Sequence, residues 1–118
     1  MRAFESYADS SADVFISHCA PSEIVQYYTK SGARGDEQTS VDLEHFREFK
    51  SPKLWFFGHY HNNNVVIDTN VDQKTIYICL PELGYFDYDT DKSVQDNMSE
   101  YMRRNIRNDN IPKVVYIR

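Results

Sequence analysis

Three of the four histidines in this 118-residue chain follow short apolar runs. His18 closes the stretch DVFISH, and His59 and His61 follow KLWFF across Gly58. An imidazole presents one nitrogen to a metal ion or a proton while a neighbouring acceptor orients the other nitrogen. The glycine should permit a backbone conformation and a close approach that a Cβ would obstruct, so that both rings of the H-x-H pair reach one small volume. His18, His59 and His61 are therefore candidates for a metal-binding or catalytic role.

A structural interpretation stays open for each of these residues, because histidines at strand ends often serve only local hydrogen bonds, and an isolated H-x-H is a weak motif. Cys19 is either a reserve thiolate ligand or a buried, inert thiol. The fourth histidine, His45, lies between a glutamate and a phenylalanine and is expected to face solvent.

The elements that must position the histidines alternate between strands and helices, which predicts an α/β fold. Strands are expected at 13–18, 53–57, 64–68, 74–80 and 113–117, and helices at 21–32, 39–49 and 93–106. The first helix should be capped by Ser22 and stopped by Gly32, and the second should open with a capping box from Thr39 to Asp42. In open α/β sheets, ligands bind beyond the carboxyl ends of the strands, where the three histidines are placed.

The stretch DVFISHCAPSEI, followed by FKSPKLWFFGHYH, resembles the second half of the calcineurin-like metallophosphoesterases. In that family, a strand ends in Ser/Thr-His, and a later strand runs into Gly-His-x-His. The resemblance implies the second half of an αββα sandwich that hydrolyses phosphate esters with two divalent ions, namely Mn, Fe or Zn. His18 and His59 would ligate one ion and His61 the other. No catalytic residue is assigned.

The motifs of the family's first half, Asp-x-His, Gly-Asp-x-x-Asp and Gly-Asn-His-Asp/Glu, are missing before His18. Gly35-Asp36 lies after that histidine, and Thr39 stands where the motif needs aspartate. We therefore expect a site that is incomplete or inactive alone, and either a partner chain with the missing N-terminal half or a homo-oligomer. DVFI and LWFF should be buried on both sides, with little chain left to cover them. The alternative is a non-catalytic remnant that acts as an interaction or regulatory subunit with at most one structural metal.

Composition bounds the remaining possibilities. Thirteen basic and eighteen acidic residues give a net charge of −5, which disfavours a non-specific binder of nucleic-acid backbone. No apolar run is long enough for a membrane span, no signal-peptide core is present, and two cysteines fit a reduced compartment, so we expect one cytoplasmic domain over residues 1–118.

Three further segments have surface interpretations. The aspartates of 87–91 resemble the start of a calcium loop, but Lys92 stands where the loop needs glycine and Met98 where it needs glutamate. We therefore expect these aspartates to stabilise the N-terminus of the next helix. The asparagines at 62–64 predict a polar loop. The basic residues of the C-terminal tail predict a solvated face, or docking onto an acidic partner or a phosphate; they are Arg103, Arg104, Arg107, Lys113 and Arg118.

Overall fold

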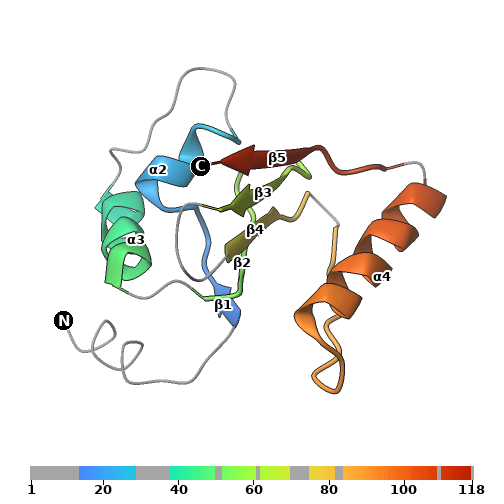
Figure 1. Cartoon of the computed structure of the whole chain (residues 1–118). Coiled ribbons are helices and arrows are strands. Elements are labelled where there is room, and N and C mark those ends of the chain that lie inside the picture. The colour runs from blue at the N-terminus through green and yellow to red at the C-terminus, as the bar shows by residue number, and fades with distance from the viewer. Residues whose placement is uncertain are drawn as a thin grey trace.

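The computed structural model describes residues 14–28, 38–49, 52–60, 62–69, 75–81, 84–108 and 110–117. It has a mixed α/β fold with a five-stranded, mostly parallel sheet and, within these ranges, three helices (Figure 1). The strands are β1 (Val14–Ile16), β2 (Leu54–Phe57), β3 (Val65–Asp68), β4 (Thr75–Cys79) and β5 (Val114–Ile117), and the helices are α2 (Ser22–Val25), α3 (Gln38–Phe49) and α4 (Val94–Arg107). None of the helices described is long and apolar enough to cross a membrane.

The sheet has the order β1-β2-β4-β3-β5. β1, β2 and β4 run parallel to one another, β3 pairs antiparallel with β4, and β5 runs parallel to β3. All five strands were expected from the sequence. The pairing of β3 with β4 confirms the two neighbouring runs as partner strands.

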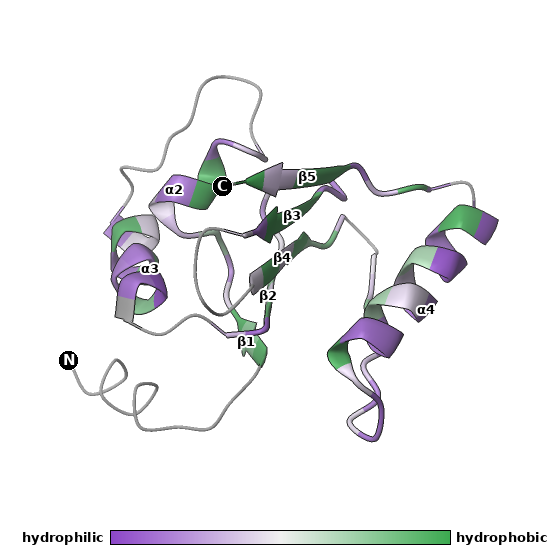
Figure 2. Ribbon diagram, in the orientation of Figure 1, coloured by the Kyte–Doolittle hydropathy of each residue, from purple (hydrophilic) through white to green (hydrophobic). Residues whose placement is uncertain are grey.

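Helices lie on both sides of the sheet, with α2 and α3 on one face and α4 on the other (Figures 1 and 2). The side chains of β2 alternate between these faces: Trp55 and Phe57 join the cluster under α2 and α3, whereas Leu54 and Phe56 join the cluster that includes α4. All four β2 residues are buried. The expectation that too little chain remains to cover LWFF is wrong, because α4 supplies the second layer.

β1 is an edge strand, so the expectation of burial on both sides is confirmed for LWFF and wrong for β1. Val14 and Phe15 are half-buried, and Ile16 is 77% exposed. The strand therefore leaves an apolar side chain at the border of the sheet, directly before the first candidate histidine.

Two predicted helix starts differ from the structure. α2 covers only Ser22–Val25, and its N-cap residue is Pro21, whose carbonyl accepts the first helical amides, so Ser22 is not the cap. The segment that follows is rich in β-branched and aromatic residues, which favour helices weakly; Gly32 lies outside the described residues. α3 begins at Gln38, so Thr39 lies inside the helix, and the Gln38 amide donates to Asp42 instead of a capping box forming.

α4 was predicted from its apolar spacing and is confirmed with a shift of one residue. Ser93 is its N-cap and accepts a hydrogen bond from the amide of Asp96 at 3.0 Å. Tyr101 is buried on the helix and stacks on Phe86 with ring centroids 4.6 Å apart. The aromatic pair fixes the preceding loop against the helix.

Candidate functional site

The carboxyl ends of β1, β2 and β4 lie at one end of the sheet, because these strands are parallel. β3 runs in the opposite direction and β5 follows it, so the first residues of β3 and β5 lie at this same end. We call it the carboxyl end of the sheet. The loops after β1 and β2, which carry His18 and His59, and the segments that lead into β3 and β5 all meet there.

Backbone hydrogen bonds hold the two histidine loops together. The Gly58 amide donates to the His18 carbonyl at 3.2 Å, which extends the β1–β2 pairing beyond the strands. The Ala20 amide donates to the Tyr60 hydroxyl at 3.0 Å. These two hydrogen bonds connect the loop after β1 to the loop after β2.

Two side-chain hydrogen bonds connect the loop after β1 to the buried core. The indole of Trp55, fully buried on β2, donates to the Ser17 hydroxyl at 2.9 Å. That hydroxyl donates in turn to the Cys19 carbonyl at 2.7 Å. These two hydrogen bonds connect buried Trp55 to the residues on both sides of His18. They restrict the backbone that carries the imidazole.

The structure brings His18 and His59 together, and their role as metal ligands stays a prediction. Their ring centroids are 4.8 Å apart with an interplanar angle of 60°, and both residues are exposed. Two imidazoles that bind one zinc ion at about 2.0–2.1 Å have centroids about 4.5–5.2 Å apart for N–metal–N angles between about 90° and 110°. The observed separation lies inside this interval, and it is also the separation of an ordinary edge-to-face contact between two rings.

The third predicted ligand, His61, lies outside the described residues. Within the part of the chain that is described, no group of three His, Cys, Asp or Glu side chains could hold a metal ion. The described geometry therefore provides two imidazole donors at the carboxyl end of the sheet and no carboxylate beside them. A calcium site at 87–91 lacks support for the same reason.

The backbone of this turn is unusual at the histidine and not at the glycine before it. His59 has a φ of 70°, in the left-handed region. A Cβ built on Gly58 would meet only the Leu80 carbonyl oxygen, at the ordinary contact distance of 3.9 Å, and Gly58 does not lie in the left-handed region. The expectation that Gly58 is needed for conformation or close approach is therefore wrong, and the strained residue is the candidate ligand itself.

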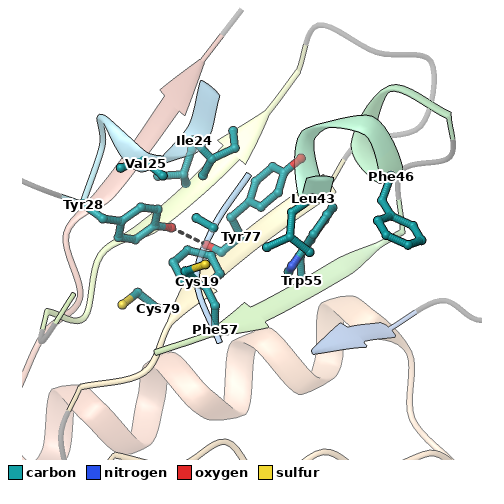
Figure 3. Close-up of a cluster of buried hydrophobic side chains, with 12 residues drawn as sticks. Cys19, Ile24, Val25, Tyr28, Leu43, Phe46, Trp55, Phe57, Tyr77 and Cys79 are labelled. Atoms are coloured by element: carbon teal, nitrogen blue, oxygen red, sulfur yellow. Dashed lines mark hydrogen bonds between the residues drawn. The ribbon is translucent and has the colours of Figure 1, made fainter. Parts of the chain in front are cut away.

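Both cysteines are buried and free. The Cys19 sulfur accepts a hydrogen bond from the Ser40 hydroxyl at 3.8 Å, which favours the inert over the reserve-ligand interpretation. Cys79, at the end of β4, donates to the Gly58 carbonyl at 3.6 Å. Burial raises the pKa of the Cys79 thiol, which Figure 3 labels within the buried cluster, to about 11, so it stays protonated at neutral pH.

Tyr28 and Tyr60 extend the aromatic packing around the turn. The buried Tyr28 hydroxyl donates to the Tyr77 carbonyl at 3.0 Å, drawn in Figure 3, and burial raises its pKa well above the ordinary value. Its ring stacks on Tyr60, and Tyr60 makes an edge contact with His59 at 5.0 Å between centroids. The packing connects the end of α2 to the histidine turn.

An ionic cluster that the sequence did not reveal joins α3 to the sheet. Arg47 donates to Glu44 at 2.7 Å, to Asp68 at 2.8 Å and to the Tyr77 hydroxyl at 3.0 Å. The second oxygen of Glu44 accepts the Glu23 amide, so the cluster also holds α2. Asp68 is 1% exposed. In the sequence, the only sign of this cluster is that Asp68, a charged residue, ends a run of β-branched residues.

The other segments singled out from the sequence have structural roles. Asn62 and Asn64 donate to the carbonyls of Tyr28 and Tyr27 at 2.6 and 3.1 Å, which ties the end of α2 to the start of β3. His45 is exposed on α3, as expected.

The loop before α4 is held by a buried side chain of that helix. Asn97 donates to the carbonyls of Asp89 and Ser93 and accepts from the Asp89 amide at 2.7 Å. The aspartate-rich loop is thus fixed at the start of α4, where negative charge is favourable.

Comparisons with protein-family models, with curated proteins and with solved structures found no match to this chain.

Proposed function

We propose that this chain provides the histidine ligands of a metallophosphoesterase-type site that acts on phosphate esters and is incomplete in the chain alone. The observation that carries the proposal is the His18–His59 pair, 4.8 Å between centroids, on the carboxyl ends of two adjacent parallel strands. His61 follows within two residues and is proposed as the ligand of a second ion. Mn, Fe or Zn all accept imidazole ligands.

Divalent ions held there would supply Lewis-acid activation of a phosphate ester and of an attacking water. The chain's own contribution is to hold the imidazoles in place. The Gly58–His18 hydrogen bond and the Ser17 relay fix the two loops before any ion arrives. Such prior ordering favours binding, because less conformational freedom is lost when the ligand is bound.

We propose that a partner chain supplies the missing carboxylates, since no described acidic side chain completes the pair. The border beside β1 is suited to such contact. An apolar groove of about 340 Å³ lies there, lined by Val14, Ile16, Phe56, Leu80, Phe86, Tyr88 and Thr90. Ile16 is two residues before His18, so one side of the groove belongs to the strand that leads into the first histidine loop.

The decisive experiment is a calorimetric titration of the full chain with Zn²⁺ and with Mn²⁺. His18→Ala and His59→Ala should each weaken binding at least about tenfold, the usual effect of losing a metal-site residue or its support. His45→Ala is the matched control, because His45 is exposed on α3, and it should leave the affinity unchanged. Equal affinity in His59→Ala and in the unmodified chain would refute the metal site and favour the remnant alternative.

Hydrolysis of an aryl phosphodiester with added Mn²⁺ tests the second part of the proposal. An incomplete site should show no rate above that of His59→Ala. A rate that the mutation abolishes would mean that the chain, alone or self-associated, already forms a complete site, and the partner proposal would fail. Light scattering on the same samples reports whether copies of the chain associate.

A further inference from the structure

Among the strands that the structure describes, β1 and β5 are the two edge strands of the sheet (Figure 1). Both edges expose apolar side chains: Ile16 of β1 is 77% exposed, and Val114 and Tyr116 of β5 are 37% and 66% exposed. All three lie on the face of the sheet that carries α4, because their neighbours on β2 and β3 belong to the cluster that includes α4. An edge strand of this kind is a template on which another strand can pair.

The hydrogen bonds of β1 show which of its backbone groups point outward. The Ser17 amide donates to the Phe56 carbonyl at 3.0 Å, so Ser17 directs its backbone groups towards β2. Successive residues of a strand direct these groups to opposite sides, so Val14 and Ile16 direct theirs away from β2. The edge of β1 therefore offers the amides and carbonyls of these two residues.

β5 offers outward groups at the same spacing. The carbonyls of Lys113 and Ile117 accept amides from the β3 segment at 2.8 and 2.9 Å, so these two residues face β3. By the same alternation, Val114 and Tyr116 direct their backbone groups away from β3. The outward residues of β5 are two positions apart, as they are in β1, and in both strands they carry the exposed apolar side chains.

We propose that β5 of one copy of this chain pairs antiparallel with β1 of a second copy, so that the sheet continues from copy to copy. Within the sheet, β5 runs antiparallel to β1. A second copy with its α4 face on the same side therefore presents the required direction. Val114 then exchanges hydrogen bonds with Ile16 of the second copy, and Tyr116 with Val14 of the second copy. Each pair brings apolar side chains together on one face, the arrangement that stabilises neighbouring strands.

Charge favours this pairing over the pairing of two like edges. Residues 1–13, which lead into β1, hold three acidic residues and one basic residue. Residues 110–118, which contain β5, hold two basic residues and no acidic residue. Two β1 edges or two β5 edges would bring segments of like charge together, whereas β1 and β5 bring opposite charges together. The chain's own β1 edge is thus the complementary occupant of its β5 edge.

The contact goes beyond the metal site, because it uses none of the histidines. It also differs from the contact with the partner chain proposed above, which uses the apolar groove on the α4 face and not the backbone edge of β1. Since the two paired edges are different, the contact is heterologous and each copy can bind two others. The strands have three and four residues, so the interface is smaller than a standard stable one and the association should be weak.

The first test is sedimentation equilibrium of the full chain in EDTA, which excludes association through metal ions. The average mass should rise steadily with concentration up to about 1 mM, the range of weak contacts. Raising NaCl from about 0.05 to 0.5 M should weaken the association severalfold, because the opposite charges are screened. A constant monomer mass over this range overturns the proposal. Association that salt leaves unchanged overturns the charge argument on which the choice of occupant depends.

Two proline variants decide which edges meet. Ile16→Pro removes an outward amide of β1, and Tyr116→Pro removes one of β5. Neither amide serves the pairing with β2 or β3, so the fold should be kept, which circular dichroism checks. Each variant alone should be monomeric, whereas an equal mixture should form dimers and nothing larger, since one intact β5 meets one intact β1. The control Ile106→Lys, 55% exposed on α4, should associate like the unmodified chain.

Other results would contradict the pairing. If Ile16→Pro still forms dimers alone, two β5 edges meet; if Tyr116→Pro does so, two β1 edges meet. A mixture that stays monomeric excludes the β1–β5 contact, and loss of association in Ile106→Lys moves the contact to α4. Should a proline variant lose its fold, Ile16→Lys and Tyr116→Lys replace the pair, because both side chains are exposed, and the same outcomes apply.

Discussion

The left-handed backbone of His59 makes a sharp prediction about stability. His59→Gly should raise the free energy of unfolding relative to His59→Ala, although both variants remove the imidazole and its contact with His18. The difference between the two variants isolates the backbone, because alanine keeps the Cβ that opposes a φ of 70° and glycine does not. Gly58→Ala should have little effect, since its Cβ meets ordinary contacts.

The magnitude follows from two opposing effects. A left-handed conformation costs about 1–2 kcal/mol for a residue with a Cβ. Glycine gives back about 0.5–1 kcal/mol through its greater freedom in the unfolded chain. His59→Gly should therefore be about 0.5–1 kcal/mol more stable than His59→Ala. For 118 residues the entropy of unfolding is about 0.25 kcal/mol/K, so the melting temperature should differ by about 2–4 °C.

Urea unfolding followed by the fluorescence of Trp55, the single tryptophan, gives these differences, and calorimetry gives the melting temperatures. The slopes must agree among the variants, because a changed slope would mean a changed denatured state. Equal stability of His59→Gly and His59→Ala would refute strain at His59. A loss of more than about 1 kcal/mol in Gly58→Ala would show that the glycine is required after all.

Three further predictions concern the frame around the site. Arg47→Met should lower the free energy of unfolding by about 3–5 kcal/mol in urea titrations, because it leaves buried carboxylates without their cation; the control Arg103→Met, in an exposed pair, should change it by less than about 1 kcal/mol. The pKa of Cys79 is raised in the folded chain, so the contribution of its neutral thiol to the free energy of unfolding is complete below pH 9 and declines as the pH rises towards 11. In urea titrations at pH 8 and pH 10.5, the free energy of unfolding should therefore fall less between the two pH values in Cys79→Ala than in the unmodified chain. Gly84→Ala should destabilise the chain, since its Cβ would lie 2.6 Å from the preceding proline ring, and an unchanged melting temperature would contradict this.

The strands and α4 could be predicted from the sequence because their signals are local. The continuous apolar run LWFF, and the helical spacing of Val94, Met98 and Tyr101, involve residues close in the chain. The meeting of His18 and His59 was implied by the family resemblance, whereas the parallel pairing of β1 and β2 that causes it was not predicted from the sequence.

What could not be predicted depends on residues far apart in the chain. Arg47 meets Asp68 across 21 positions and the Tyr77 hydroxyl across 30, and no local pattern marks such partners. Asn62 and Asn64 likewise reach the carbonyls of Tyr28 and Tyr27 across 34 and 37 positions. The prediction for Gly58 was wrong for a related reason. A glycine suggested an unusual backbone conformation at position 58, whereas the residue with the left-handed backbone is His59, one position later.

The strain at His59 also separates the two functional hypotheses. The ring is exposed, so burial offsets little of the cost of its left-handed backbone, and glycine at this position should be more stable than alanine. In a metal site, His59→Gly relieves the backbone but loses a ligand, so its melting temperature without metal should exceed that of His59→Ala while its Zn²⁺-dependent increase disappears. A Zn²⁺-dependent increase that is as large in His59→Gly as in the unmodified chain would place the ion elsewhere and leave the strain without a functional explanation.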